Sequence, residues 1–378
     1  MTYCLMDGNE AVARAAMASG CRFFAGYPIT PATGILNSML ALLPPAGGVC
    51  LQGEDEIASI GYCLGASMAG MKVMTATSGP GISLYSEQIS FAIGSEIPIV
   101  IVDVQRLGPS TGSATRGADG DIQFLRWGNS GGMPVIVLAP VDVQDCYELT
   151  VQAFNLAEIH RCPVFIASNK EVAMTRESLD TDILKIPEIV RRRAPKGEKP
   201  YLPFTVETGR YVPDFRPMGG NVIVRQTSST HGPDGHITAD PAEIAANRKR
   251  LMEKLADAPD FFSFEQQPDR PETDPVVITY GVTARAARAA AKELREEGIH
   301  VALLILKSLW PVPGTTIVRY TRNAAAIAVI EMNLGQYVHE IKRLVPDRPV
   351  RFFGRMDGAL ITPQQIKEVI RHAGQSAE

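Results

Sequence analysis

The chain has 378 residues, of which 45% are hydrophobic, and it carries 37 basic and 41 acidic side chains. Because a single hydrophobic core stops growing near ~250 residues, this length and composition predict two domains. The net charge of -4 gives no overall positive field, which argues against nucleic acid or an anionic membrane as a partner.

The N-terminal sequence "MTYCLMDGNEAVARAAMASG" has no basic segment followed by an apolar run, and no stretch of ~18 consecutive apolar residues occurs. We therefore expect a cytoplasmic protein that does not span a membrane. The six cysteines are scattered without a C-x-x-C pair, a pattern typical of reduced core thiols rather than of disulfides or a metal site. If the protein takes part in redox chemistry, we expect another chain to hold the metal.

The first part of the chain alternates helix and strand signals. Residues 9–20 predict a helix that Asn9 caps and Gly20 ends. A strand that runs into a proline-bounded loop follows at residues 22–30. Short apolar runs of the kind found in strands covered on both faces lie at residues 47–52, 71–77, 97–104, 133–140 and 162–168. Helical stretches such as residues 141–160 separate them, and this βαβ rhythm predicts a parallel sheet.

Residues 175–270 break this rhythm, since they are rich in proline, glycine and charge. We expect a long connecting arm with one charged helix at residues 241–258. From residue 275 the alternation resumes with an alanine-rich helix at 283–298 and an apolar strand at 300–308, and it ends in a helix at 362–373. This segment predicts a second, smaller α/β domain.

Four loops follow predicted strands of the first domain. Open α/β sheets bind ligands at the carboxyl ends of their strands, so chemistry is expected there. The loops are rich in residues that let a ligand approach the backbone and that offer hydroxyl groups. Their sequences are "GYPITPATG", "QGEDEIAS", "TATSGPGIS" and "DVQRLGPSTGSATRGADGD".

Three carboxylates, Glu54, Asp55 and Glu56, open the helix that follows the second loop. The helix dipole favours negative charge there by roughly 0.3 to 1 kcal/mol each, so capping alone explains them. Alternatively, Glu56 shares a helix face with Ser59 and Cys63, and a carboxyl buried on that face would hold or share a proton. Both interpretations remain open on spacing alone.

The glycine-rich turn "TSGPG" is weak evidence by itself. It lacks the lysine of a P-loop and the pattern of a dinucleotide site, so ATP and NAD receive no support. Arg106 emerges directly from the strand at 97–104, where it either pairs with Asp103 or a neighbouring chain, or binds the carboxylate of a ligand with both arms of its guanidinium. The six histidines form no H-E-x-x-H motif, and we expect no metal site in this chain.

Several motifs together resemble the alpha subunits of 2-oxoacid:ferredoxin oxidoreductases, most closely those acting on 2-oxoglutarate. They run in order from "GYPITPAT" through "GEDEIASIGYCLGAS", "PIVIVDVQRLGPSTG" and "LKSLWPVP" to "EMNLGQ" and cover nearly the whole chain. The resemblance implies an α/β fold with a thiamine diphosphate-binding, pyrimidine-type parallel-sheet domain at 1–190. A connecting arm at 191–272 and a smaller transketolase C-terminal-like α/β domain at 273–378 would follow.

In this family the alpha and beta chains share thiamine diphosphate, and the beta chain holds the diphosphate, Mg²⁺ and a [4Fe-4S] cluster. The resemblance implies that the catalytic Glu56 faces N1′ of the aminopyrimidine and favours the imino form that removes the thiazolium C2 proton. It assigns Thr30 and Arg106 to the carboxylate end of the substrate. The implied remaining contacts are Tyr27, Pro28, Ile29, Ser78 and Gly79 to the cofactor, and Ser110 and Thr111 to the substrate.

The implied reaction converts 2-oxoglutarate, coenzyme A and oxidised ferredoxin to succinyl-CoA, CO2 and reduced ferredoxin, in an (alpha-beta)2 assembly. Two alternatives remain: another 2-oxoacid, such as a branched-chain one, and a non-catalytic scaffold of the same fold. For the distal carboxylate of 2-oxoglutarate, Arg126 in "DIQFLRWG" is the candidate and Arg116 the second choice. A structural Arg126 paired with Asp119 or Asp121 is the alternative.

Overall fold

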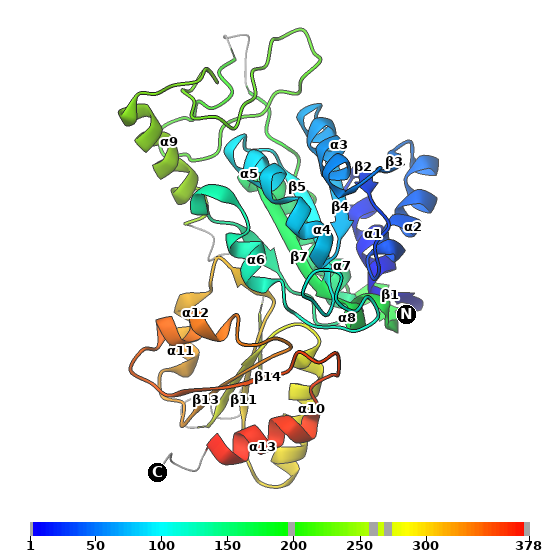
Figure 1. The fold of residues 1–378 in the computed structure, drawn as a ribbon, viewed down its shortest axis with the longest axis vertical. Helices are drawn as coiled ribbons and strands as arrows, with labels where there is room; N and C mark the ends of the chain where they lie inside the picture. Colours follow the sequence, from blue (N-terminus) through cyan, green and yellow to red (C-terminus); the bar gives the residue numbers. More distant parts are fainter. Residues whose placement is uncertain (1–2, 196–200, 257–263, 268–273, 374–378) are drawn as a thin grey trace.

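We analysed a computed structural model of the chain, which describes residues 3–195, 201–256, 264–267 and 274–373 (Figure 1). The larger unit is built on a seven-stranded sheet in which all neighbours are parallel except the last pair. In spatial order its strands are β3 (Val49–Gln52), β2 (Cys21–Gly26), β4 (Lys72–Thr77), β5 (Ile99–Gln105), β7 (Pro163–Asn169), β6 (Ile136–Leu138) and the antiparallel β12 (Ser308–Trp310). The predicted parallel sheet is confirmed.

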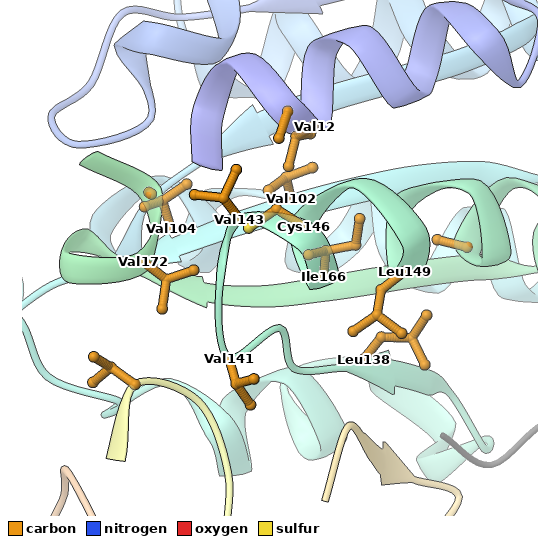
Figure 2. Close-up of a cluster of buried hydrophobic side chains, with 14 of the residues drawn as sticks. Val12, Val102, Val104, Leu138, Val141, Val143, Cys146, Leu149, Ile166 and Val172 are labelled. Atoms are coloured by element: carbon orange, nitrogen blue, oxygen red, sulfur yellow. The ribbon is translucent and has the colours of Figure 1, made fainter. Parts of the chain in front are cut away.

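Helices cover both faces of this sheet. One face carries α1 (Gly8–Ala18), α2 (Thr33–Leu42) and α7 (Val143–His160), and the other carries α3 (Glu56–Met68), α4 (Gly79–Leu84), α5 (Ser86–Gly94) and α6 (Ile122–Trp127). Figure 2 shows Val12 of α1 and Val143 and Cys146 of α7 gathered near Val102 and Val104 of β5. Each such fully buried aliphatic side chain contributes about 1.5 to 3 kcal/mol.

On one face of strand β5, the side chains change from apolar to polar along the strand. Val100, Val102 and Val104 belong to the core under α1 and α7, whereas Ile99 and Ile101 belong to the core under α3 to α6. Because successive side chains of a strand point to opposite faces, Asp103 and Gln105 continue the row of Ile99 and Ile101. The second face therefore becomes polar at its carboxyl end, while remaining fully buried.

Some details differ from the sequence expectations. The side chain of Asp7, not Asn9, caps α1 by accepting a hydrogen bond from the backbone N–H of Glu10 (2.8 Å). Strand β3 lies at the sheet edge with Val49 41% and Leu51 39% exposed, so it is not covered on both faces. Beside the sheet, β1 (Tyr3–Asp7) and β8 (Arg176–Asp180) form a small antiparallel ribbon, next to the short helix α8 (Lys170–Met174).

The smaller unit is a five-stranded sheet between two helical layers, and its prediction as a second α/β domain is confirmed. Its strands in spatial order are β14 (Val350–Gly354), β13 (Ile327–Glu331), β10 (Val276–Thr279), β11 (Ala302–Leu306) and the antiparallel β9 (Phe264–Gln267). Helices α10 (Thr283–Glu296) and α13 (Pro363–Ala373) pack on one face, and α11 (Gly314–Thr321) and α12 (Val338–Leu344) on the other. Strand β12 leaves this unit to extend the larger sheet, so the two units share a sheet.

At residues 191–195 and 201–256, the connecting arm is irregular apart from α9 (Pro241–Glu253), whereas residues 264–267, which were expected to belong to the arm, form β9 of the smaller sheet. Short 3₁₀ turns occur in the larger unit at Pro44–Ala46, Ser130–Gly132 and Thr181–Ile183. The arm is fastened to the larger unit by a buried ionic cluster. The carboxylate of Glu96 accepts hydrogen bonds from Arg250 Nη1 (3.0 Å) and Lys254 Nζ (3.2 Å). Arg161, fully enclosed, donates to the carbonyls of Glu96 (3.1 Å) and Asp214 (3.1 Å).

No helix of the described residues is long and apolar enough to cross a bilayer.

Glu96→Gln is expected to destabilise the protein by ~2 kcal/mol near neutral pH, because it removes the charge that compensates two buried cations. Burial alone raises the pKa of Glu96, but Lys254 and Arg250 outweigh it and lower that pKa to about 2. A carboxyl with a lowered pKa stabilises the fold above its unfolded pKa, so the difference from wild type should shrink as the pH falls from ~4 toward 2. Urea unfolding at several pH values measures this. Glu253→Gln, which changes an exposed pair with Lys249, is the control and should shift stability by less than ~0.5 kcal/mol.

Candidate active site

The four predicted loops meet at one edge of the larger sheet. Strands β3, β2, β4 and β5 are parallel neighbours, so their carboxyl ends point the same way. Tyr27 lies in the loop after β2 and Asp55 in the loop after β3. Ser78 follows β4, and Arg106 follows β5. The site described below is built from side chains and backbone of these four loops.

Glu56 is the first residue of α3, and its side chain is only 8% exposed. Asp55, not Glu56, caps the helix, since its Oδ1 accepts a hydrogen bond from the backbone N–H of Ala58 (2.7 Å). A Cβ atom added at Gly81 would lie 3.0 Å from Glu56 Oε1 and 2.0 Å from Thr77 Oγ1. Glycine at position 81 therefore makes room for the Glu56 carboxyl, which helix capping does not require.

The turn after β4 lies between two carboxyl groups. Gly81, in this turn, adjoins Glu56, and a Cβ added at Gly79 would lie 3.2 Å from Asp121 Oδ2. The hydroxyl of Ser78 is buried and has no hydrogen-bond partner among the described residues. A buried hydroxyl without a partner, beside two glycines and an enclosed carboxyl, offers a hydrogen-bonding group to a ligand that approaches the backbone closely.

Arg106 ties the loop after β5 to the loop after β2. Its Nη1 donates to the carbonyl oxygen of Thr30 (2.6 Å), while its buried Nε has no partner in the described part of the chain. The Thr30–Pro31 peptide is cis, and Asn9 Nδ2 donates to the Pro31 carbonyl (3.0 Å). The side chain of Asn9 thus supports this loop instead of capping a helix. The carboxyl that interacts electrostatically with Arg106 is that of Asp121.

The carboxyl groups of Asp103 and Asp121 interact with each other: Asp103 is fully buried, Asp121 is partly buried, and both Asp103 oxygens and Asp121 Oδ2 are enclosed without a hydrogen-bond donor among the described residues. Burial raises the pKa of Asp103 well above its ordinary value, and the neighbouring Asp121 raises it further. Burial also raises the pKa of Asp121, while Arg106 opposes this shift. Asp119 lies in the same loop, and burial raises its pKa to about 7.

The smaller unit holds the loop that carries Asp121. Asn333 Nδ2 donates to the carbonyl of Asp119 (2.9 Å), and Gln336 Oε1 accepts from the backbone N–H of Gln123 (2.9 Å). Figure 1 shows α6, which starts at this loop, above the junction with the smaller unit. The motif "EMNLGQ" therefore has a structural role at the site that its sequence alone did not indicate, because its partners lie more than two hundred residues earlier in the chain.

The remaining predicted residues lie around this centre. Tyr27 (38%), Pro28 and Thr30 are exposed, and Ile29 is partly buried. Ser110 and Thr111 are exposed in a loop that a bridge between Leu107 and Ser113 closes. This loop presents their hydroxyls to solvent in the isolated chain.

Arg126 stacks on Trp127, with its guanidinium carbon 3.8 Å from the ring centroid. Its Nη1 donates to the carbonyl of Met133 (3.1 Å), so its partner is backbone rather than Asp119 or Asp121. Arg116, the second choice, is exposed. Among the described residues, no three His, Cys, Asp or Glu side chains gather in a way that suits a metal ion.

Comparison with known families agrees with this geometry. Residues 14–250 match the family described as "Pyruvate flavodoxin/ferredoxin oxidoreductase, thiamine diP-bdg", and residues 273–366 match "Pyruvate:ferredoxin oxidoreductase core domain II". A split-gene transketolase is 14% identical with a TM-score of 0.58 over 98% of each chain, a likeness that shows the fold alone. The expected fold class is confirmed.

Individual relatives cover the chain almost completely. The 2-oxoglutarate synthase subunits KorA of Methanothermobacter thermautotrophicus and Archaeoglobus fulgidus are 38% and 39% identical over 97% of this chain and 97% and 98% of their own. The structure of 2-oxoglutarate:ferredoxin oxidoreductase from Magnetococcus marinus, with 2-oxoglutarate, coenzyme A and succinyl-CoA bound, is 32% identical with a TM-score of 0.91. The likeness covers 99% of this chain and 65% of that one. The chain therefore belongs to the thiamine diphosphate-binding family of pyruvate flavodoxin/ferredoxin oxidoreductases, the 2-oxoacid:ferredoxin oxidoreductases.

Proposed function

We propose that this chain is the alpha subunit of a 2-oxoglutarate:ferredoxin oxidoreductase. The complex would interconvert 2-oxoglutarate, coenzyme A and oxidised ferredoxin with succinyl-CoA, CO2 and reduced ferredoxin. The observation that carries the proposal is the enclosed Glu56 carboxyl beside Gly81 and the unpartnered Ser78 hydroxyl, a set of groups that fits the pyrimidine side of thiamine diphosphate. Retention of this carboxyl argues against a non-catalytic scaffold.

Each group of the chain has a proposed task. Bound thiamine diphosphate supplies the electron sink that decarboxylation of a 2-oxoacid requires. Glu56 would exchange a proton with N1′ of the aminopyrimidine, and its burial keeps water from competing for that proton. Arg106 and the Thr30 hydroxyl would hold the carboxylate end of the substrate. The other proposed contacts are Tyr27, Pro28, Ile29, Ser78 and Gly79 to the cofactor, and Ser110 and Thr111 to the substrate.

A partner chain would complete the site. Large apolar side chains are exposed on α3 and α4, including Ile57 (47%), Tyr62 (45%) and Leu84 (47%), as expected of a surface that another subunit covers. We propose that this beta subunit supplies the diphosphate site, Mg²⁺ and the [4Fe-4S] cluster that passes electrons to ferredoxin. We further propose an (alpha-beta)2 assembly in the cytoplasm, and domain limits at 1–190, 191–272 and 273–378.

The identity of the substrate rests on the relatives and on one arginine. The KorA subunits are 38–39% identical, whereas the ketoisovalerate oxidoreductase subunit VorB of Methanothermobacter thermautotrophicus is 33% identical over 99% of this chain, which favours 2-oxoglutarate. The distal carboxylate of 2-oxoglutarate needs a cationic partner, because an unpaired buried charge is too costly. We propose that Arg126 is the cationic partner of the distal carboxylate, since stacking on Trp127 fixes the plane of its guanidinium.

Arg126→Leu is expected to lower kcat/KM for 2-oxoglutarate by more than ~1.4 kcal/mol, or tenfold, relative to 2-oxobutyrate, which lacks the distal charge. Steady-state kinetics of the assembled complex measure this ratio, and Arg116→Leu is the matched comparison. Equal losses on both substrates would instead assign Arg126 to support of the 132–133 backbone, to which its guanidinium is bonded.

The function itself is tested by expressing the chain with its beta subunit and assaying CoA-dependent reduction of ferredoxin with a panel of 2-oxoacids. Activity that is highest with 2-oxoglutarate and needs thiamine diphosphate supports the proposal. Metal analysis of each chain tests the division of labour, because stoichiometric iron in this chain alone would contradict it. Higher activity with a branched-chain 2-oxoacid would favour the alternative substrate class.

A further inference from the structure

We propose that Asp103 and Asp121 form a carboxyl pair that retains one proton, and that this proton keeps Arg106 available for the carboxylate of an anionic 2-oxoacid. The inference rests on the function proposed above, because it concerns the substrate end of the same site. It makes the pair a determinant of substrate affinity rather than a catalytic group. Three features of the structure carry it: the burial of Asp103, the fixed position of Asp121, and the charge balance with Arg106.

The first feature is the surroundings of Asp103. The residue is fully buried, and neither of its carboxylate oxygens has an N–H or hydroxyl partner among the described residues. The Asp121 carboxyl interacts with it, and Asp121 Oδ2 is likewise enclosed without a partner among the described residues. Two carboxylates cannot satisfy each other without a proton between them. The protonated Asp103 carboxyl therefore donates to the Asp121 carboxylate, which removes the cost of an isolated buried charge.

The second feature is the anchoring of the loop that carries Asp121. Its own backbone N–H donates to Oε1 of Gln105 (2.9 Å) on β5. Before it in the chain, the N–H of Asp119 donates to the carbonyl of Met332 (2.8 Å), and after it Gln336 receives the N–H of Gln123. The backbone on both sides of Asp121 is thus held in place, which keeps its carboxyl close to that of Asp103.

The third feature is the balance of charge around the pair. The positive charge of Arg106 lowers the pKa of Asp121. The carboxyl of Asp119, in contrast, raises the pKa of Asp103 further. On the other side, the turn at Ser78 and Gly79 brings no ionisable side chain. The charges of Glu171 in α8 and of Glu331 in the smaller unit raise the pKa of Asp119.

With one proton on the pair, Arg106 and the two carboxyls sum to zero charge. Without it they sum to minus one, which repels an incoming carboxylate.

The sign of the pH dependence follows from this balance. The raised pKa of Asp103, and that of Asp121 at about 6, mean that the pair loses its proton within or above the neutral range. As the pH rises through that range, the extra negative charge weakens binding of a substrate carboxylate. KM for 2-oxoglutarate should therefore rise, on the order of tenfold, as the pH increases through the pKa of the pair. KM for coenzyme A should not follow the same curve.

Asp103→Asn is the decisive variant, because its amide donates to Asp121 as the protonated carboxyl does but cannot lose a proton. In the complex with the beta subunit, KM for 2-oxoglutarate should stay at the low-pH wild-type value across the whole range. Asp121→Asn leaves Asp103 titratable, but its charge and that of Arg106 then sum to zero at high pH, so KM for 2-oxoglutarate should not rise there above the low-pH wild-type value; this variant provides the test if the first one does not fold. Asp119→Asn is the comparison variant: it retains the acceptor for Asn169, and because it removes a negative charge that raises the pKa of Asp103, it should move the pH dependence toward lower pH without abolishing it.

A second readout does not depend on turnover. Infrared spectroscopy of the wild-type complex near pH 6 should show the C=O stretch of a protonated carboxylic acid that is missing from Asp103→Asn. A missing band in wild type, a pH-independent KM in an active complex, or loss of the pH dependence in Asp119→Asn would each overturn the proposed pair. A complex that shows the band but does not turn over 2-oxoglutarate would instead contradict the proposed function.

Discussion

Glu56→Gln should reduce turnover of the assembled complex by ~10² to 10⁴-fold while leaving the fold intact. The glutamine amide occupies nearly the same volume beside Gly81 and can still form hydrogen bonds, but it cannot exchange a proton with N1′ of the aminopyrimidine. Helix α3 should not be affected, because its capping group is the Asp55 carboxylate. Single-turnover and steady-state rates with 2-oxoglutarate measure the loss, and thermal unfolding measures the integrity of the fold.

Glu54→Gln is a matched control for this prediction. Glu54 lies two residues away in the same acidic run, but its side chain is exposed, so the same change of charge at this position should leave turnover near wild type. If the Glu56→Gln complex kept more than about a tenth of the wild-type rate, Glu56 would not be the proton-transfer group, since such groups contribute at least ~10²-fold. A loss of similar size in Glu54→Gln would mean that the charge of the run, rather than one carboxyl, matters.

The larger sheet could be predicted from the sequence because its central strands are short runs of aliphatic residues. Strands β4, β5 and β7 are buried on both faces, and nothing but a covered parallel strand accommodates such runs between helices. Strand β12 was not predicted, because three residues joined to β6 across the domain boundary carry no local periodicity. The pairing of β1 with β8 is similarly long-range.

The candidate site was predictable only in part, because contacts between residues far apart in the chain leave no local pattern in the sequence. Arg106 directly follows β5 and Glu56 opens the helix after β3, so the rule that strand ends form the site placed both residues near it, but only the resemblance to a known family gave them their roles. Asp103 reads as one polar residue within an apolar strand, and only the folded loop reveals that Asp121 faces it. The contact of Gln336 with Gly120 and Gln123 depends on how two sheets are docked, which no sequence window contains.

Arg106→Ala is expected to raise KM for every 2-oxoacid by the equivalent of ~2 to 5 kcal/mol, at least about thirtyfold, because it removes the cation from the end that all these substrates share. The lost bond to the Thr30 carbonyl would also loosen the loop after β2. Arg106→Lys should be intermediate, since lysine keeps the charge but not the planar fork of donors. KM values for several 2-oxoacids and for coenzyme A, measured on the same preparation, separate a substrate-specific effect from general damage.

Thr30→Val isolates the hydroxyl from the backbone at this position. Arg106 binds the carbonyl oxygen of Thr30, which valine retains, so only the side-chain hydroxyl is lost. The expected rise in KM is correspondingly smaller, ~0.5 to 1.5 kcal/mol for a neutral hydrogen bond, and should again be the same for each 2-oxoacid. Negligible changes in KM for both Arg106→Ala and Thr30→Val would remove this corner from the substrate site. A large effect of Arg106→Ala alone would leave the guanidinium as the carboxylate ligand and the threonine as the backbone support that aims it.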